Sequence, residues 1–73
     1  MVKQYANGNP WPKKLKALRA HYDVTQEQVA SRIHAPASTW RNWEYGRRKV
    51  SPTVARLLVL SFPEFFRRNP MSG

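Results

Sequence analysis

The stretch Val24–Lys49, VTQEQVASRIHAPASTWRNWEYGRRK, predicts two short helices joined by a tight turn and followed by a basic loop. Thr25 can cap the first helix, because its hydroxyl can accept the backbone N–H of Gln28 while the Gln28 side chain reaches back. Pro36 disfavours helical geometry in the residue before it, so this helix is expected to end near Ile33. The rest of the chain is expected to support this unit.

The second helix of the unit is expected from about Pro36 to Tyr45, closed by Gly46. At about 100° per residue, Trp40 and Trp43 point to one side, and their spacing favours core packing over stacking on a base. The opposite side is the polar front of this helix, formed by Ala37, Ser38, Arg41, Asn42 and Tyr45.

Helices are also expected on both sides of this unit. One runs from Pro12 to about Tyr22, another from Pro52 to about Phe62, and a short one ends at Arg68. We therefore expect an all-α fold of five short helices. The expected parts are a flexible N-terminal arm, one helical domain and a short tail, at residues 1–10, 11–69 and 70–73.

The last two helices carry more apolar side chains than one face can hold. The fourth is apolar over most of its circumference, and such a helix is normally buried all round, which a chain of 73 residues can hardly achieve alone. Phe65 and Phe66 are adjacent, so we expect them not to face the same core. We therefore expect a homodimer whose interface is built from Val59, Leu60, Phe62, Phe65 and Phe66.

The charge balance favours a polyanionic partner. Thirteen Lys and Arg against four Asp and Glu give a formal net charge of +9. Nucleic acid is favoured over a membrane, because no apolar run approaches the roughly 20 residues that span a bilayer. The first residues lack the layout of a signal peptide, so a cytoplasmic location is expected.

The sequence contains no set of side chains suited to catalysis or metal binding. There is no cysteine, and His21 and His34 are too few for a zinc site. The four acidic residues lie apart from one another in sequence, and no glycine-rich phosphate loop is present. We expect no metal, no cofactor and no enzymatic activity.

The polar front has the chemistry that reads base pairs in the major groove of double-stranded DNA. Arg41 can donate to guanine O6 and N7, and Asn42 can pair with adenine N6 and N7. Ser38 can either contact a base or cap a shortened helix by accepting the backbone N–H of Arg41.

Phosphate contacts are expected around the front, because the basic loop follows it directly. Arg47, Arg48 and Lys49 lie in that loop, and Gln26 lies in the first turn of the preceding helix, whose free N–H groups attract anions. Lys14 is also assigned to phosphate. The alternative for Lys14 and its neighbouring lysines is an ordinary solvated helix face.

The residues VTQEQVASRI, a short turn and STWRNWEYGRRK together resemble the helix-turn-helix of the Cro and phage-repressor (XRE-like) family. The resemblance covers about Leu15 to Pro52, with T-Q-E-x-x-A and W-E-x-G-x-R at the family's mutual spacing. It implies five short helices, the second and third forming the reading unit. It also implies a partly buried ion pair between Arg19 and Glu44, backbone contacts from Gln26 and Tyr45, and base-reading positions at Ala37, Ser38, Arg41 and Asn42.

Three positions depart from the family pattern. His34 replaces the turn glycine, and a left-handed conformation there carries a steric cost. Pro36 replaces the usual Ser or Thr cap, so the start of the reading helix can shift. Trp40 replaces an aliphatic core residue and requires a larger space between helices.

These features favour a sequence-specific transcriptional repressor encoded by a phage, plasmid or operon. It would act as a homodimer on a palindromic operator and regulate its own operon. One alternative is the antitoxin of a toxin and antitoxin pair, which would use its C-terminal apolar surface on a cognate toxin. A basic protein that coats RNA or a membrane is a further alternative, disfavoured by the helix-turn-helix spacing.

Overall fold

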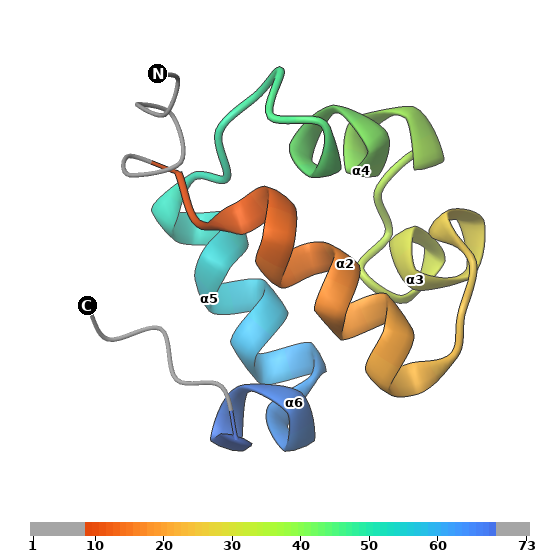
Figure 1. Ribbon diagram of the computed structural model, residues 1–73, viewed down its shortest axis with the longest axis vertical. Helices are drawn as coiled ribbons and strands as arrows, with labels where there is room; N and C mark the ends of the chain where they lie inside the picture. Colours follow the sequence, from red (N-terminus) through yellow and green to blue (C-terminus); the bar gives the residue numbers. More distant parts are fainter. Residues whose placement is uncertain (1–8, 69–73) are drawn as a thin grey trace.

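The computed structural model describes residues 9–68, and this part of the chain forms helices and no strand (Figure 1). Within residues 9–68 the expected all-α fold of five short helices is therefore confirmed. The expected arm at residues 1–10 lies outside the described residues except for Asn9 and Pro10, and the expected tail at 70–73 lies wholly outside them. The helices are α2 at Trp11–Tyr22, α3 at Gln26–Arg32, α4 at Ala37–Glu44, α5 at Pro52–Ser61 and α6 at Pro63–Arg68. None of these helices is long and apolar enough to cross a membrane.

The helix ends follow the capping chemistry of the sequence. At the start of α3, Thr25 Oγ1 accepts the Gln28 N–H at 3.1 Å and Gln28 Oε1 accepts the Thr25 N–H at 2.9 Å, which confirms the capping box. At the start of α5, Ser51 Oγ accepts the N–H of Val54 at 3.2 Å. These caps fix the points at which the chain enters both helices.

The turn between α3 and α4 contains the expected strain. His34 has a φ of 58°, the left-handed conformation that a glycine adopts at less cost. Pro36 is extended, with φ −66° and ψ 148°, and serves as the N-cap of α4 without a side-chain hydrogen bond. The helix therefore starts at Ala37, one residue later than expected.

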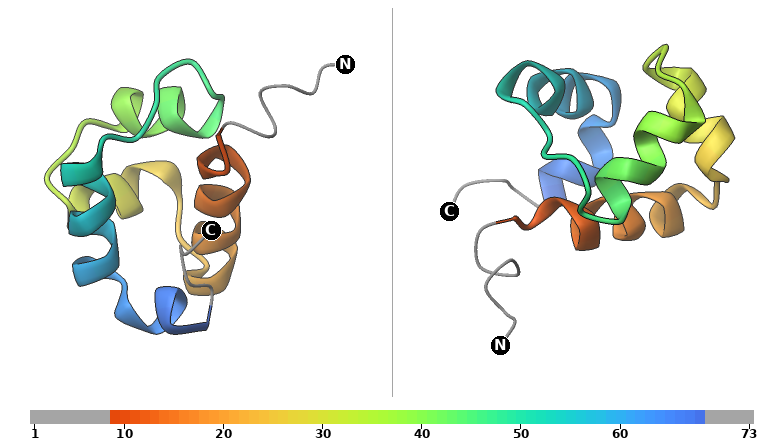
Figure 2. Two further views of the ribbon diagram at one scale, coloured as in Figure 1. Left: turned by 90° about the vertical axis from the view of Figure 1, so that its left-hand side faces the viewer. Right: turned by 90° about the horizontal axis from the view of Figure 1, so that it is seen from above.

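All five helices contribute to a single core. Leu15 and Leu18 of α2, Val29 of α3, Trp40 of α4 and Leu58 of α5 are each 0% exposed. Figure 1 and the left view of Figure 2 place α4 and α6 at opposite ends of the molecule. The polar front of α4 is thus well separated from the C-terminal helix.

The C-terminal phenylalanines correct one expectation. Phe62, Phe65 and Phe66 are 1%, 3% and 6% exposed and lie in the core of the protomer. The expectation that Phe65 and Phe66 could not share a core was wrong, because their rings meet edge to face with centroids 5.1 Å apart and Trp11 packs against Phe66. Buried side chains cannot contact a second subunit unless the protomer opens, so these three residues do not form an available dimer surface.

Helix α5 also differs from its expected burial. Only Leu58 among its residues is fully enclosed, whereas Leu57, Val59 and Leu60 are 40%, 38% and 71% exposed. The expectation of excess apolar surface therefore applies to one side of α5 and not to α6. We refer to Leu57, Val59 and Leu60 as the α5 patch.

Candidate nucleic-acid interface

Helix α4 has a buried side, which we call the root, and an accessible front. Trp40, Trp43 and Glu44 are buried, whereas Ser38 is exposed and Arg41 and Asn42 are half-buried. Because Pro36 is the cap, Ser38 lies inside the helix and does not cap it. The hydroxyl of Ser38 therefore belongs to the accessible surface of α4, together with Ala37, Arg41 and Asn42.

The basic loop is fixed to the end of this front through the backbone. The carbonyl oxygen of Asn42 accepts the N–H of Arg47 at 2.9 Å and the N–H of Arg48 at 3.2 Å. Gly46 has a φ of 78° and lets the chain reverse at this point. Two exposed cations are thereby held directly beside a candidate base-reading residue.

Tyr45 is the last residue of the front and lies next to the basic loop. Its side chain is 54% exposed, and the Arg47 guanidinium carbon lies 5.6 Å from the centre of its ring, within cation–π distance. Lys14 approaches the same region from α2, where it lines a hollow of about 630 Å³ together with Tyr45 and Gly46. Lys14 and Tyr45 are thus brought together at the C-terminal end of α4, whereas Ser38 lies in its first turn.

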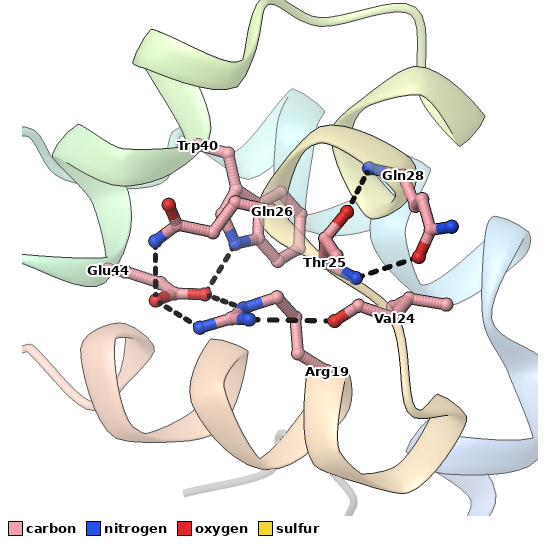
Figure 3. Close-up of polar contacts among 7 residues, drawn as sticks. All are labelled: Arg19, Val24, Thr25, Gln26, Gln28, Trp40 and Glu44. Atoms are coloured by element: carbon pink, nitrogen blue, oxygen red, sulfur yellow. Dashed lines mark hydrogen bonds and ion pairs between the residues drawn. The ribbon is translucent and has the colours of Figure 1, made fainter.

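Glu44 is the polar centre of the root (Figure 3). Its carboxylate accepts hydrogen bonds from Arg19 Nε at 2.6 Å, Arg19 Nη2 at 3.2 Å, Gln26 Nε2 at 3.1 Å and Trp40 Nε1 at 2.6 Å. Its side chain is 1% exposed, so the carboxylate exchanges its water for donors from α2, α3 and α4. The ion pair implied by the family resemblance is present between Arg19 and Glu44.

The protonation of this pair follows from its contacts. Burial is the largest influence on the pKa of Glu44 and alone would raise it, but the hydrogen bonds from Arg19, Trp40 and Gln26 and the charge of Arg19 lower the pKa below its ordinary value. The hydrogen bond to Glu44 raises the pKa of Arg19, against the opposing effect of burial. Both groups are charged at neutral pH.

Two contacts of Glu44 were not expected from the sequence. Gln26 was predicted to contact phosphate, a role that stays a prediction, and its amide N–H group donates to Glu44. The indole of Trp40 was expected only to pack, yet it donates to the same carboxylate. The sequence contained a signal for the second contact, because Trp40 and Glu44 lie four residues apart on one helix.

A third unexpected contact involves Arg41, the candidate guanine reader. Arg41 Nη1 lies 3.7 Å from Glu27 Oε2, so α3 supplies a carboxylate to the front of α4. The distance is longer than a hydrogen bond, and both side chains remain accessible to solvent. Among residues 9–68, no group of three His, Cys, Asp or Glu side chains is placed to hold a metal ion.

Comparison with known proteins agrees with this geometry. Residues 13–60 match the model of a family described as a helix-turn-helix domain. A segment of 47 residues is 34% identical to part of the Type II methyltransferase M.MspI of Moraxella sp, and the match covers 64% of this chain but 11% of the methyltransferase. No solved structure gives a significant match. The family match spans α3, the turn and α4 together with most of α2 and α5, and the chain therefore belongs to the helix-turn-helix domain family of DNA-binding proteins.

Proposed function

We propose that this protein is a sequence-specific transcriptional repressor that binds double-stranded DNA as a homodimer on an inverted repeat. The observation that supports this most is the joint placement of Arg41 and Asn42 on the front of α4 and of Arg47 and Arg48 on the carbonyl of Asn42. The residues proposed to read bases and those proposed to bind phosphate are thus joined through the backbone into one unit. Such a unit can fix its register on the duplex while it reads base edges.

Binding would insert α4 into the major groove. Arg41 would donate to guanine O6 and N7, Asn42 would pair with adenine, and Ser38 would contact a neighbouring base or sugar. Arg47, Arg48 and Lys49 would neutralise phosphates beside the groove, adding affinity without sequence preference. Lys14 and Tyr45 would extend these backbone contacts toward α2.

The root would keep α4 at a fixed angle during this process. Trp40 is completely buried and its indole is hydrogen-bonded to Glu44, which Arg19 holds from α2. Movement of α4 would break these contacts together, so the helix that carries the proposed base-reading side chains is held in place before DNA arrives. Preorganisation of this kind reduces the ordering that binding requires.

The α5 patch would join two protomers. Leu60 is 71% exposed and Leu57 is 40% exposed on a helix that otherwise contributes to the core. A chain of this size with a single small core also benefits from a second subunit. Two α4 helices related by a two-fold axis would read half-sites about one helical turn apart, at roughly 34 Å. Occupation of promoter DNA by the dimer would block polymerase.

The function can be measured by selecting duplexes from a randomised pool and mapping protection on the enriched sequence. We expect an inverted repeat with two protected half-sites, and sedimentation should give the mass of two chains on DNA. Uniform protection of every duplex, without enrichment of any sequence, would contradict sequence-specific repression. A single protected half-site bound by one chain would contradict the homodimer and leave base reading intact.

The similarity to part of a methyltransferase favours a second candidate, in which the chain is the recognition unit of such an enzyme. A recognition unit would co-purify with a methyltransferase when the two are co-expressed and would need it for full selectivity. An antitoxin would behave in the same way with its toxin. A repressor that acts alone reaches its full selectivity as a homodimer.

A further inference from the structure

Glu27 places a negative charge beside the residue proposed to read guanine. It lies in the first turn of α3, and its carboxylate pairs with Arg41 of α4 at 3.7 Å. Within the described residues Glu27 is the only charged group recorded in a pair with Arg41. Any carboxylate on a DNA-binding face repels phosphate and lowers the affinity for every duplex. A negative charge at Glu27 is therefore unfavourable for DNA binding unless its contact with Arg41 improves the reading of the base.

The geometry of the pair leaves the reading edge of Arg41 available. Glu27 approaches Nη1, whereas a guanine can be read by the two parallel N–H groups on Nε and Nη2. A long arginine side chain loses rotamer freedom when it makes two hydrogen bonds to one base. A carboxylate that restrains the guanidinium before binding reduces this loss, and it does so only for the orientation that it favours.

We propose that Glu27 is a positioning residue that sets the selectivity of Arg41 for guanine, an inference that rests on the DNA-reading function proposed above. Glu27 lowers affinity for all DNA through its charge and raises the preference for one base pair through Arg41. Specificity is a difference between affinities, so the two effects together increase discrimination. Glu27 also lies in the first turn of α3, where an acidic side chain is favourable, but this position stabilises the helix without discriminating between bases.

Glu64 provides a matched control. It forms a comparable exposed pair with Arg67 at 3.9 Å, on α6 at the other end of the molecule from α4 (Figures 1 and 2). Glu64→Gln and Glu27→Gln each remove one negative charge, so both change the net charge by the same amount. A difference between the two variants therefore reports position and not total charge.

The experiment measures Kd for the selected operator and for a set of operators with one base pair changed, at one salt concentration. The base pair read by Arg41 is the one whose substitution no longer matters in Arg41→Ala. At that base pair we expect Glu27→Gln to reduce discrimination about two- to fivefold, the range typical of an exposed ion pair. Other positions should keep their discrimination, affinity for unrelated duplexes should rise, and Glu64→Gln should leave the discrimination pattern unchanged.

Two controls separate this inference from the function on which it rests. In the Arg41→Ala background, Glu27→Gln should have no further effect on base discrimination, and circular dichroism should show that each variant is folded. If Glu27→Gln weakens all operators equally, or leaves the Arg41-dependent position unchanged, Glu27 is only a helix-stabilising residue and the proposal is overturned. If the unmodified protein itself does not discriminate between duplexes, the proposed sequence-specific function is contradicted, independently of the role of Glu27.

Discussion

Replacement of Trp40 by phenylalanine isolates the hydrogen bond that links the root of α4 to Glu44. The indole donates to Glu44 Oε2 at 2.6 Å, and the residue is completely buried. Trp43→Phe is the matched control, because Trp43 is 5% exposed and its indole forms no hydrogen bond within residues 9–68. Both substitutions remove the same atoms from neighbouring positions of one helix.

The expected loss of stability has two parts. The smaller ring leaves a gap in either variant, which we estimate at about 1–2 kcal/mol from the cost of larger aromatic truncations. Trp40→Phe also removes a hydrogen bond to a buried charge, worth about 1.5–3 kcal/mol. Trp40→Phe should therefore reduce the free energy of unfolding by about 1.5–3 kcal/mol more than Trp43→Phe does.

Urea unfolding followed by circular dichroism at pH 7 measures both variants. A domain of this size is stable by only about 4–11 kcal/mol, so the difference should be visible as a shift in the midpoint. Equal losses in the two variants would show that the indole of Trp40 contributes only its volume. A larger loss in Trp43→Phe would refute the assignment of Glu44 as the polar centre of the root.

Three further outcomes are expected. The pKa of Glu44 is lower in the folded protein than in the unfolded chain, so the charged carboxylate stabilises the fold. This stabilisation is complete above the ordinary glutamate pKa of about 4.3 and is lost as the pH falls through the lower pKa of the folded state. The free energy of unfolding should therefore fall more steeply with acid in the unmodified protein than in Glu44→Gln. His34→Gly should raise the free energy of unfolding by about 0.5–1 kcal/mol, because His34 has a φ of 58° that glycine adopts at less cost. Ser31→Gly, at an exposed position within α3, should lower the free energy of unfolding by a similar amount. Leu60→Lys should shift sedimentation toward the mass of the monomer. Ala17→Lys adds the same charge at an exposed position of α2 and should cause no such shift. Equal shifts in the two variants would exclude the α5 patch as the dimer contact.

Local rules were sufficient for most of the fold. The capping box of Thr25 and Gln28, the stop before Pro36 and the spacing of Trp40 and Trp43 each depend on neighbours within one or two turns. These features determined the helix order and the division of α4 into root and front. They could be predicted from the sequence because the residues that enforce them are close together in the chain.

The C-terminal packing could not be predicted in this way. Phe65 and Phe66 both reach the core because α6 packs beside α2, where Tyr22 Oη accepts the N–H of Phe65 at 3.2 Å and Trp11 covers Phe66. Tyr22 lies 43 residues before Phe65 in the sequence. A helical wheel of the last segment contains no information about them.

In the candidate site, too, some contacts between different helices could not be predicted from the sequence. The front of α4 follows from helical periodicity, but the contact of Gln26 with Glu44 and that of Glu27 with Arg41 join different helices. Both depend on how closely α3 approaches α4. The motif positions of Gln26 and Glu27 therefore did not indicate these partners, whereas the family resemblance did imply the pair of Arg19 and Glu44.

The central claim is that α4 reads base sequence while the loop after it holds phosphate. The most direct measurement compares Arg41→Ala and Arg48→Ala on the selected operator and on single-base-pair variants over a range of salt concentrations. We expect Arg41→Ala to lose about 1–3 kcal/mol of preference at one position, and Arg48→Ala to weaken all duplexes alike and reduce the salt slope by about one. If both variants change every duplex by the same factor, the division between reading and anchoring residues is contradicted.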